Sequence, residues 1–158
     1  MPKWFYLALL IAVPLTLLPA QTPSQRGLTR DPASDPAGLY SFVKEGESVQ
    51  LTLDEGELSG YITRFGESDS DKGQLIDQFF SKGSLKGNHL TFATKTVHGV
   101  WYEFNGTIEI QPGKAPGAEG YRVIKGTLKQ HSQDANGKDS ARERSVEFKS
   151  FPEGVSRP

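Results

Sequence analysis

The sequence predicts an all-β fold: an eight-stranded antiparallel up-and-down β-barrel, preceded by a signal peptide and a disordered linker. Three observations carry this prediction. Apolar and polar residues alternate with a period of two through most of the chain after residue 36, which is typical of strands with one buried face. Turn residues interrupt the alternation every ~8–12 positions, as in sandwiches and barrels. Most connectors are also too short for the crossovers that parallel strands need.

The N-terminal segment MPKWFYLALLIAVPLTLLPA has the features of an export signal. Lys3 gives the N-terminal region a positive charge, an apolar run follows, and Ala20 is a small residue suited to the cleavage site. The alternative is a membrane anchor, but Pro14 interrupts the run and a spanning helix needs about 20 apolar residues. We therefore expect residues 1–20 to be a cleaved signal peptide. The protein would then be exported, periplasmic or extracellular, with no stable membrane insertion after cleavage.

The rest of the chain divides into three segments. Residues 21–36 are rich in Pro, Ser and charge without an apolar period, which predicts a disordered linker. Residues 37–152 form the β-barrel domain, one domain by its length. Residues 153–158 are expected to be a disordered C-terminal tail.

The composition excludes several function classes. The chain has no cysteine, which rules out disulfides, thiolate metal sites and thiol catalysis. Without Lys3 the mature chain has 17 basic and 19 acidic residues. This balance predicts no nucleic-acid partner, because phosphate binding needs a basic surface. The three histidines lack the spacing of metal ligands, so we expect no metal and no cofactor.

The clearest strand lies at residues 47–54, where Val49, Leu51 and Leu53 alternate with polar residues. Dipeptides such as His98-Gly99 suit the tight turns of hairpins. The predicted strands are 38–44, 47–54, 57–65, 75–85, 88–97, 99–110, 120–131 and 141–151. The longer connectors are 66–74, 111–119 and 132–140.

A weak internal repeat places glycine between apolar residues of the strands. Gly60, Gly106 and Gly126 share the pattern apolar, any, Gly, any, apolar, and Gly87 belongs to a truncated fourth copy. Glycine weakens a strand interior, so its repetition on the inward face predicts tight bends or close approach inside a coiled sheet. Ordinary β-bulges are the alternative.

This succession of eight strands resembles the up-and-down barrels of the lipocalin and avidin kind. Gly38-Leu39-Tyr40 is similar to the Gly-x-Trp that opens lipocalins, with tyrosine in place of tryptophan. Arg142 and Arg144 lie on the last strand, where lipocalins carry an arginine that packs on that aromatic ring. Here, however, we expect them at the opposite end from Tyr40. The resemblance covers the whole meander at the level of topology, and it implies a ligand-holding barrel without naming a ligand.

Inward residues differ between the two ends of the predicted barrel. One end collects large apolar residues, and the other collects polar and charged ones. An apolar floor with a few convergent polar groups is typical of small-molecule pockets, and eight strands leave room for one small ligand. The residues predicted to bind a ligand are Arg64, Asp77, Thr94, Tyr102 and Arg144. Alternatively, Arg64 and Asp77 pair with each other and close this end without a cavity.

Three functions follow as hypotheses. The first is binding of a small amphipathic or anionic ligand inside the barrel. The second is an interaction module with a filled core, which binds a protein or glycan through an exposed aromatic face. That face would consist of Tyr61, Phe65, Phe80 and Trp101. The weakest is an enzyme that uses Asp77 or His98, since no local catalytic motif is present.

Overall fold

The computed structural model describes Met1 and residues 35–134 and 136–154. The predicted signal peptide after Met1, the predicted linker up to residue 34 and the last four residues of the predicted tail lie outside the described residues. The described part forms eight strands and contains no helix, and so it has none long and apolar enough to cross a membrane. The strands are β1 (Gly38–Ser41), β2 (Ser48–Asp54), β3 (Glu57–Phe65), β4 (Leu75–Lys86), β5 (His89–Thr94), β6 (Val100–Ile110), β7 (Arg122–Gln133) and β8 (Asp139–Lys149).

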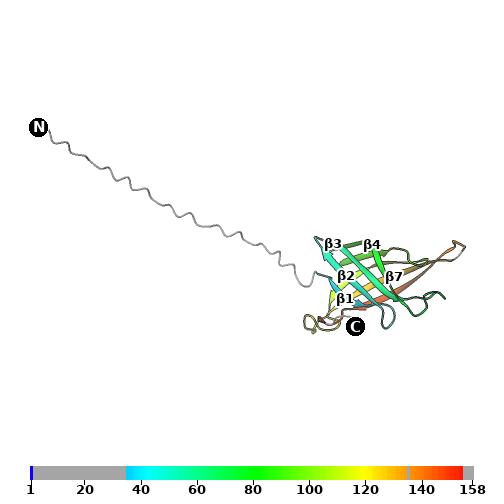
Figure 1. Cartoon of the computed structure of the whole chain (residues 1–158). Coiled ribbons are helices and arrows are strands. Elements are labelled where there is room, and N and C mark those ends of the chain that lie inside the picture. The colour runs from blue at the N-terminus through cyan, green and yellow to red at the C-terminus, as the bar shows by residue number, and fades with distance from the viewer. Residues whose placement is uncertain (2–34, 135, 155–158) are drawn as a thin grey trace.

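Each strand pairs antiparallel with the next, in the order β1 to β8 (Figure 1). This confirms the predicted all-β meander, and the topology is consistent with that of lipocalin-like and avidin-like barrels. The sheet is a curled half-barrel. β1 meets the end of β8 and the two residues after it. The contacts are a 3.0 Å hydrogen bond from Lys149 N to Ser41 Oγ, a bridge between Tyr40 and Ser150 and a 2.8 Å hydrogen bond from Phe151 N to Leu39 O. β1 has only four residues, so most of the eleven-residue β8 has no partner strand on that side.

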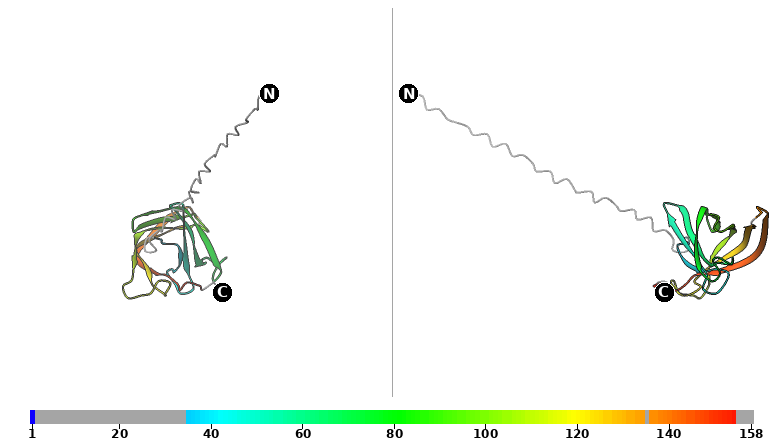
Figure 2. Two further views of the ribbon diagram at one scale, coloured as in Figure 1. Left: turned by 90° about the vertical axis from the view of Figure 1, so that its left-hand side faces the viewer. Right: turned by 45° about the vertical axis from the view of Figure 1, so that its right-hand side comes forward.

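The edges of the sheet therefore diverge away from this closed end. Figure 2 shows the β7–β8 hairpin extending away from β2 and β3. The inner face of the hairpin is consequently open to solvent near its tip, where Ser140 and Arg142 are exposed. The hairpin is long because β7 and β8 stay in unbroken register from Val123–Lys149 to Gln133–Asp139.

The interior is filled by aromatic rings that contact one another in a chain. Phe80 stacks on Phe92 with ring centroids 4.4 Å apart, and Phe92 stacks on Phe104 at 5.1 Å. The chain continues through Phe148 and Phe42 to Tyr102, with centroid separations of 5.4, 5.2 and 5.6 Å. Aliphatic residues close the core on either side: Val49, Leu51, Leu58, Ile62, Leu90, Ile108, Ile124 and Leu128. Burial of such side chains stabilises the fold by roughly 1.5–3 kcal/mol each.

Three glycines of the repeat allow close approach of neighbouring strands. A Cβ atom on Gly60 would lie 2.1 Å from Gln50 O, and one on Gly126 would lie 2.3 Å from Asn105 O. A Cβ atom on Gly106 would lie 2.2 Å from Lys125 O and 2.5 Å from Phe104 Cζ. The predicted close approach is confirmed at these positions.

Gly87 of the truncated copy serves a different purpose. It lies in the β4–β5 turn with φ of 62°, and nothing lies within 4 Å of a Cβ built on it. Gly87 is therefore not part of the inward set, but its positive φ fits the tight hairpin turn that the dipeptide Gly87-Asn88 predicts.

A β-bulge in β4 reverses the predicted faces of its first half. The register with β5 shifts between Phe80 and Lys82, so Ser81 is an extra residue. One extra residue exchanges the two faces of a strand. Gln78 and Phe80 therefore point inward, whereas Phe79 is 56% exposed. Simple alternation along this strand predicts that Asp77, Phe79 and Leu85 all point inward. That prediction is wrong for Asp77 and Phe79, whereas Leu85, beyond the bulge, packs against the core.

Candidate functional site

We call the end of the half-barrel where β3 ends and β4 begins the mouth. The opposite end is apolar, with Leu58, Leu90 and Ile108 buried there. Inward side chains at the mouth are polar, as the sequence predicts, because the strands that start or finish here carry Arg64, Thr94 and Arg144 on their inner face. The five predicted ligand-binding residues nevertheless occupy three different environments.

Arg64 and Thr94 belong to a buried polar cluster that we call the plug, which consists of Arg64, Gln78 and Thr94. Arg64 is 3% exposed. It donates hydrogen bonds to Gln78 Oε1 at 3.0 Å, Phe65 O at 3.2 Å and Val97 O at 3.4 Å. A buried guanidinium needs such partners, because an unpaired buried charge is costly.

Gln78 holds the plug together. Three acceptors share the two N–H groups of its Nε2: Thr94 Oγ1 at 3.0 Å and the backbone oxygens of Lys95 and Val100, each at 2.7 Å. Thr94 Oγ1 also accepts a 3.0 Å hydrogen bond from the Tyr102 amide. The plug thus links four strands through protein partners. Sequence reasoning missed Gln78, because only the bulge brings its side chain to the inner face, and two adjacent phenylalanines fit either parity.

Asp77 lies on the outer face, away from the plug. Its cross-strand neighbour is Thr63, whose hydroxyl donates to the Asp77 carboxylate, while Arg64 is opposite Ile76. Asp77 is exposed. The expected inward pair of Arg64 and Asp77 is therefore wrong. The amide of Gln78 takes the place that the sequence assigned to the carboxylate.

Tyr102 lies beneath the mouth and packs edge-on against Phe42. It is 4% exposed. Burial raises the pKa of its phenol to about 12, a shift that the Arg64 charge partly offsets. The phenol therefore stays protonated at neutral pH, and the hydroxyl can act only as a neutral polar group.

Arg144 belongs to a cavity of about 450 Å³ on the inner face of the β7–β8 hairpin. This mouth cavity is within the size range of small-molecule sites, ~300–1,000 Å³. It is lined by Lys44, Glu67, Val100, Gln130, Ser132, Ser140, Ala141, Arg142 and Arg144. The lining has three cations and one carboxylate, so its charge is positive. The loops that follow β1 and β3 supply Lys44 and Glu67.

The carboxylate of the mouth cavity is already paired. Lys44 Nζ lies 2.6 Å from Glu67 Oε1. This hydrogen bond lowers the pKa of Glu67, helped by the Lys44 and Arg64 charges and a hydrogen bond from Gln130. Arg144 Nη2 donates to Gln130 Oε1 at 3.1 Å. The guanidinium charges of Arg142 and Arg144 are therefore left in excess.

One polar atom of the mouth cavity lacks a protein acceptor. Arg144 Nε is buried and has no hydrogen-bond partner among the described residues. Buried N–H groups are normally hydrogen-bonded, so this atom stands out among the polar groups that line the cavity. Arg144, a predicted ligand-binding residue, lines this cavity together with Arg142, which the sequence also assigns to the polar end of the sheet.

A second feature holds the loop beside the mouth in place. The Asp71 carboxylate lies 2.5 Å from His98 Nδ1 and accepts hydrogen bonds from the Ser68 amide and hydroxyl. The hydrogen bonds from Ser68 and His98 lower the pKa of Asp71 to about 2. His98 sits in the two-residue turn before β6, where Val97 and Val100 exchange backbone hydrogen bonds. The pair ties residues 66–74 to this turn. Among residues 35–134 and 136–154, no three His, Asp or Glu side chains gather as a metal site would require.

The aromatic residues that the sequence predicts outside the barrel are only partly there. Tyr61 contacts Phe79 on the outer face, with ring centroids 5.4 Å apart. Trp101 stacks on His131 at 4.7 Å, also on the outer face. Phe80 points inward, so its predicted outward position is wrong, because the bulge at Ser81 exchanges the two faces of β4. Phe65 is half-buried and lies beside Gly46.

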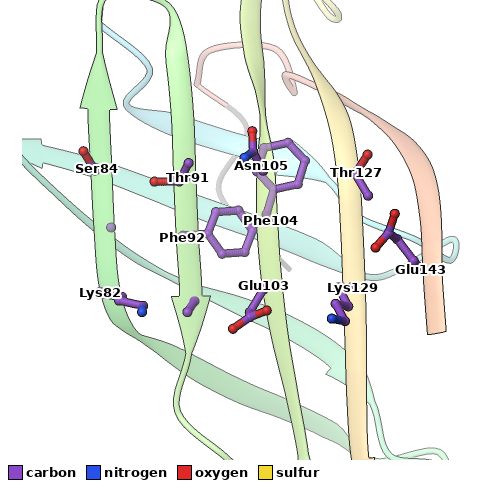
Figure 3. Close-up of a pocket in the computed structure, with 12 residues that line it drawn as sticks. Lys82, Ser84, Thr91, Phe92, Glu103, Phe104, Asn105, Thr127, Lys129 and Glu143 are labelled. Atoms are coloured by element: carbon purple, nitrogen blue, oxygen red, sulfur yellow. The ribbon is translucent and has the colours of Figure 1, made fainter. Parts of the chain in front are cut away.

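A broad hollow of about 500 Å³ lies on the outer face of β4 to β8 (Figure 3). The labelled side chains come from all five strands and include both charges. Its lining includes the small residues Ser84, Thr91, Ala93 and Thr127 as well as Phe92 and Phe104. Comparison with known proteins adds no further assignment, because no protein-family model, curated protein or solved structure matches this chain.

Proposed function

We propose that this protein is an exported binding protein that holds a small anionic or amphipathic ligand at the mouth of the half-barrel. The observation that carries the proposal is the mouth cavity, where two guanidinium groups remain after Lys44 and Glu67 have paired. Arg144 Nε there also lacks an acceptor among the described residues. No catalytic step is part of the proposal.

The chemistry of the cavity favours a carboxylate or a phosphate. Arginine presents a planar fork of donors that matches the oxygens of both groups, and such charge-assisted hydrogen bonds are about twice as strong as neutral ones. The hydroxyls of Ser132 and Ser140, 2.8 Å apart, and the side chain of Val100 complete the lining. The aromatic rings fill the deeper interior, so the ligand binds at the mouth instead of deep within the sheet.

Titration with two defined anions tests this function. ¹⁵N-labelled protein is titrated with inorganic phosphate and with octanoate at constant ionic strength, and the amide shifts are mapped. We expect shifts at Gln130, Arg142 and Arg144 for at least one anion. Arg144→Gln should abolish them, because it removes the fork and the orphaned N–H.

The matched control is Lys86→Gln, which removes one positive charge at the apolar end and should leave binding unchanged. Equal binding to the Arg144→Gln and wild-type proteins would contradict the mouth as the site. Absence of shifts with both anions at millimolar concentration would contradict the anionic ligand class.

Export is a separate part of the proposal and has its own test. The N-terminal sequence of protein recovered from the periplasm or culture medium should start near Gln21, because the apolar run is short and interrupted by Pro14. Retention of Met1 would contradict cleavage.

A second candidate function is favoured by the outer face of β3 and β4. Leu75 and Phe79 are each 56% exposed, and Tyr61 adjoins Phe79. Exposed apolar clusters are typical of interaction sites, so this patch would bind a protein or a glycan. Fluorescence of the dye ANS should fall on Phe79→Ser if the patch is accessible. Unchanged fluorescence would count against this candidate.

A further inference from the structure

Two cross-strand rows of the outer face contribute most of the residues that line the hollow in Figure 3, and the row Gly83, Phe92, Phe104 lies between them. The floor row of the hollow runs Ser84, Thr91, Asn105, Thr127 across β4, β5, β6 and β7, each residue directly opposite the next. All four side chains are polar, uncharged and small. Side chains in register on one face form a continuous surface, so the floor is a strip of hydroxyl and amide groups interspersed with threonine methyls.

The neighbouring row carries charges of both signs. Lys82, Ala93, Glu103, Lys129 and Glu143 lie opposite one another across β4 to β8. The two lysines and two glutamates cancel. A strongly anionic ligand would meet the glutamates and a strongly cationic one the lysines, so this row favours a neutral ligand.

The hollow is elongated across the strands. Five strands at a spacing of ~4.8 Å span about 19 Å. A shallow depression over β7 and β8 adjoins it at Thr127, with Ser145 and Glu147 in its lining. An extended ligand with several repeating units fits this shape better than a compact one.

We propose that this outer hollow binds a linear neutral oligosaccharide. Sugar hydroxyls both donate and accept hydrogen bonds, as do the hydroxyls of Thr91 and Thr127 and the amide of Asn105. The threonine methyls and the Ala93 side chain offer apolar contact to the C–H faces of the rings. The site lies on the opposite face of the sheet from the mouth cavity, so it stands independently of the anion-binding function.

Trp101 provides a reporter for this site. It lies one row beyond Glu103 on the same face of β6, and it stacks on His131, whose Nε2 is 3.2 Å from Glu103 Oε2. The chain has only two tryptophans, Trp4 and Trp101. In a Trp4→Phe variant, Trp101 is therefore the only indole, and a ligand in the hollow should change its fluorescence.

The test titrates the full-length Trp4→Phe protein with four hexasaccharides. Cellohexaose and maltohexaose are neutral, a galacturonate hexamer is anionic and a glucosamine hexamer is cationic. We expect a saturable fluorescence change with at least one neutral sugar, and weaker or no binding of the charged ones.

The decisive variant combines Thr91→Val and Thr127→Val, which replaces two hydroxyls by methyls without changing shape or strand preference. It should weaken binding of the neutral sugar about tenfold. Thr52→Val on β2 is the matched control and should bind as the parent does. Arg144→Gln should also leave sugar binding unchanged, which separates this proposal from the anionic ligand of the mouth.

Three results would overturn the proposal. The first is no fluorescence change with either neutral sugar at millimolar concentration. The second is tighter binding of a charged hexamer. The third is equal affinity for the Thr91→Val/Thr127→Val variant at an unchanged unfolding midpoint. Binding of an extended peptide in place of both neutral sugars would assign the hollow to a protein partner and reject the glycan.

Discussion

Arg64 donates a 3.0 Å hydrogen bond through Nε to Gln78 Oε1, and both side chains are buried at the mouth of the half-barrel. Through Gln78 the guanidinium is connected to Thr94 and to the backbone at Lys95 and Val100. One amide thus joins strands that have no direct sheet pairing. These hydrogen bonds connect the strands at the mouth, whereas stacked aromatic rings connect them in the interior.

The first prediction concerns this amide. Gln78→Leu leaves Arg64 Nε and the carbonyls of Lys95 and Val100 without their partner. Each buried unsatisfied group costs about 1–3 kcal/mol. We therefore expect urea denaturation to show a loss of about 3 kcal/mol or more in the free energy of unfolding. The control is Asp77→Asn on the outer face, which should cost less than about 1 kcal/mol. A larger loss for Asp77→Asn than for Gln78→Leu would contradict the assigned faces of β4.

The second prediction uses two adjacent phenylalanines. Phe80→Ala removes a ring that stacks on Phe92. Because Phe80 is half-buried, we expect a loss toward the lower end of the ~3–5 kcal/mol typical of Phe→Ala in cores. Phe79→Ala, at an exposed site, should stay within about 1 kcal/mol of the parent. Thermal and urea unfolding measure both variants. Equal losses would mean that the bulge at Ser81 is absent.

The third prediction compares a glycine that is needed because a side chain would clash with one that is needed because of its positive φ. Gly106→Ala should destabilise the fold by about 3 kcal/mol, at the upper end of overpacking costs. Its Cβ would meet the Lys125 carbonyl, which cannot rotate away as a side chain can. Gly87→Asn is the contrast, because Asn tolerates a positive φ and the surrounding space is open. It should leave the denaturation midpoint nearly unchanged. A tolerated Gly106→Ala would rule out close approach at Gly106.

The fourth prediction is a dependence of stability on pH. The pKa of Asp71 is lowered to about 2 by hydrogen bonds from Ser68 and His98, against an ordinary value near 3.9 for Asp. A lowered pKa in the folded state means that the carboxylate stabilises the fold above about pH 4. This contribution is lost as the pH falls toward 2.

Urea unfolding at pH 5, 4, 3 and 2 measures this effect on wild type and Asp71→Asn. The difference between the two proteins should be largest at pH 5 and shrink toward pH 2. Asp69→Asn, an exposed site in the same loop, serves as the control and should show no such trend. A difference that stays constant over this range would refute a role for the Asp71 charge.

The sequence by itself determined the strands, their order and the polarity of the two ends. These features depend on local physics. Alternation such as Val49, Leu51 and Leu53 specifies a half-buried strand, and turn residues such as His98-Gly99 specify an antiparallel neighbour. The position of Arg144 on the inner face near the polar mouth follows from the same alternation of faces along a strand, because β8 contains no bulge.

Only the tertiary structure decided which face each half of β4 presents, and with it the partner of Arg64. Asp77 and Gln78 are equally plausible partners in a strand that carries two adjacent phenylalanines. The partner of Arg64 depends on whether Phe79 or Phe80 stacks against Phe92. Phe92 belongs to another strand, so the local pattern of β4 does not reveal this contact. The mouth cavity and the outer hollow likewise result from the curvature of the sheet and from edges that meet near Tyr40 and Ser150 and diverge beyond them. Such features arise from long-range packing among strands, where one inserted residue at Ser81 exchanges the faces of the residues that precede it in β4.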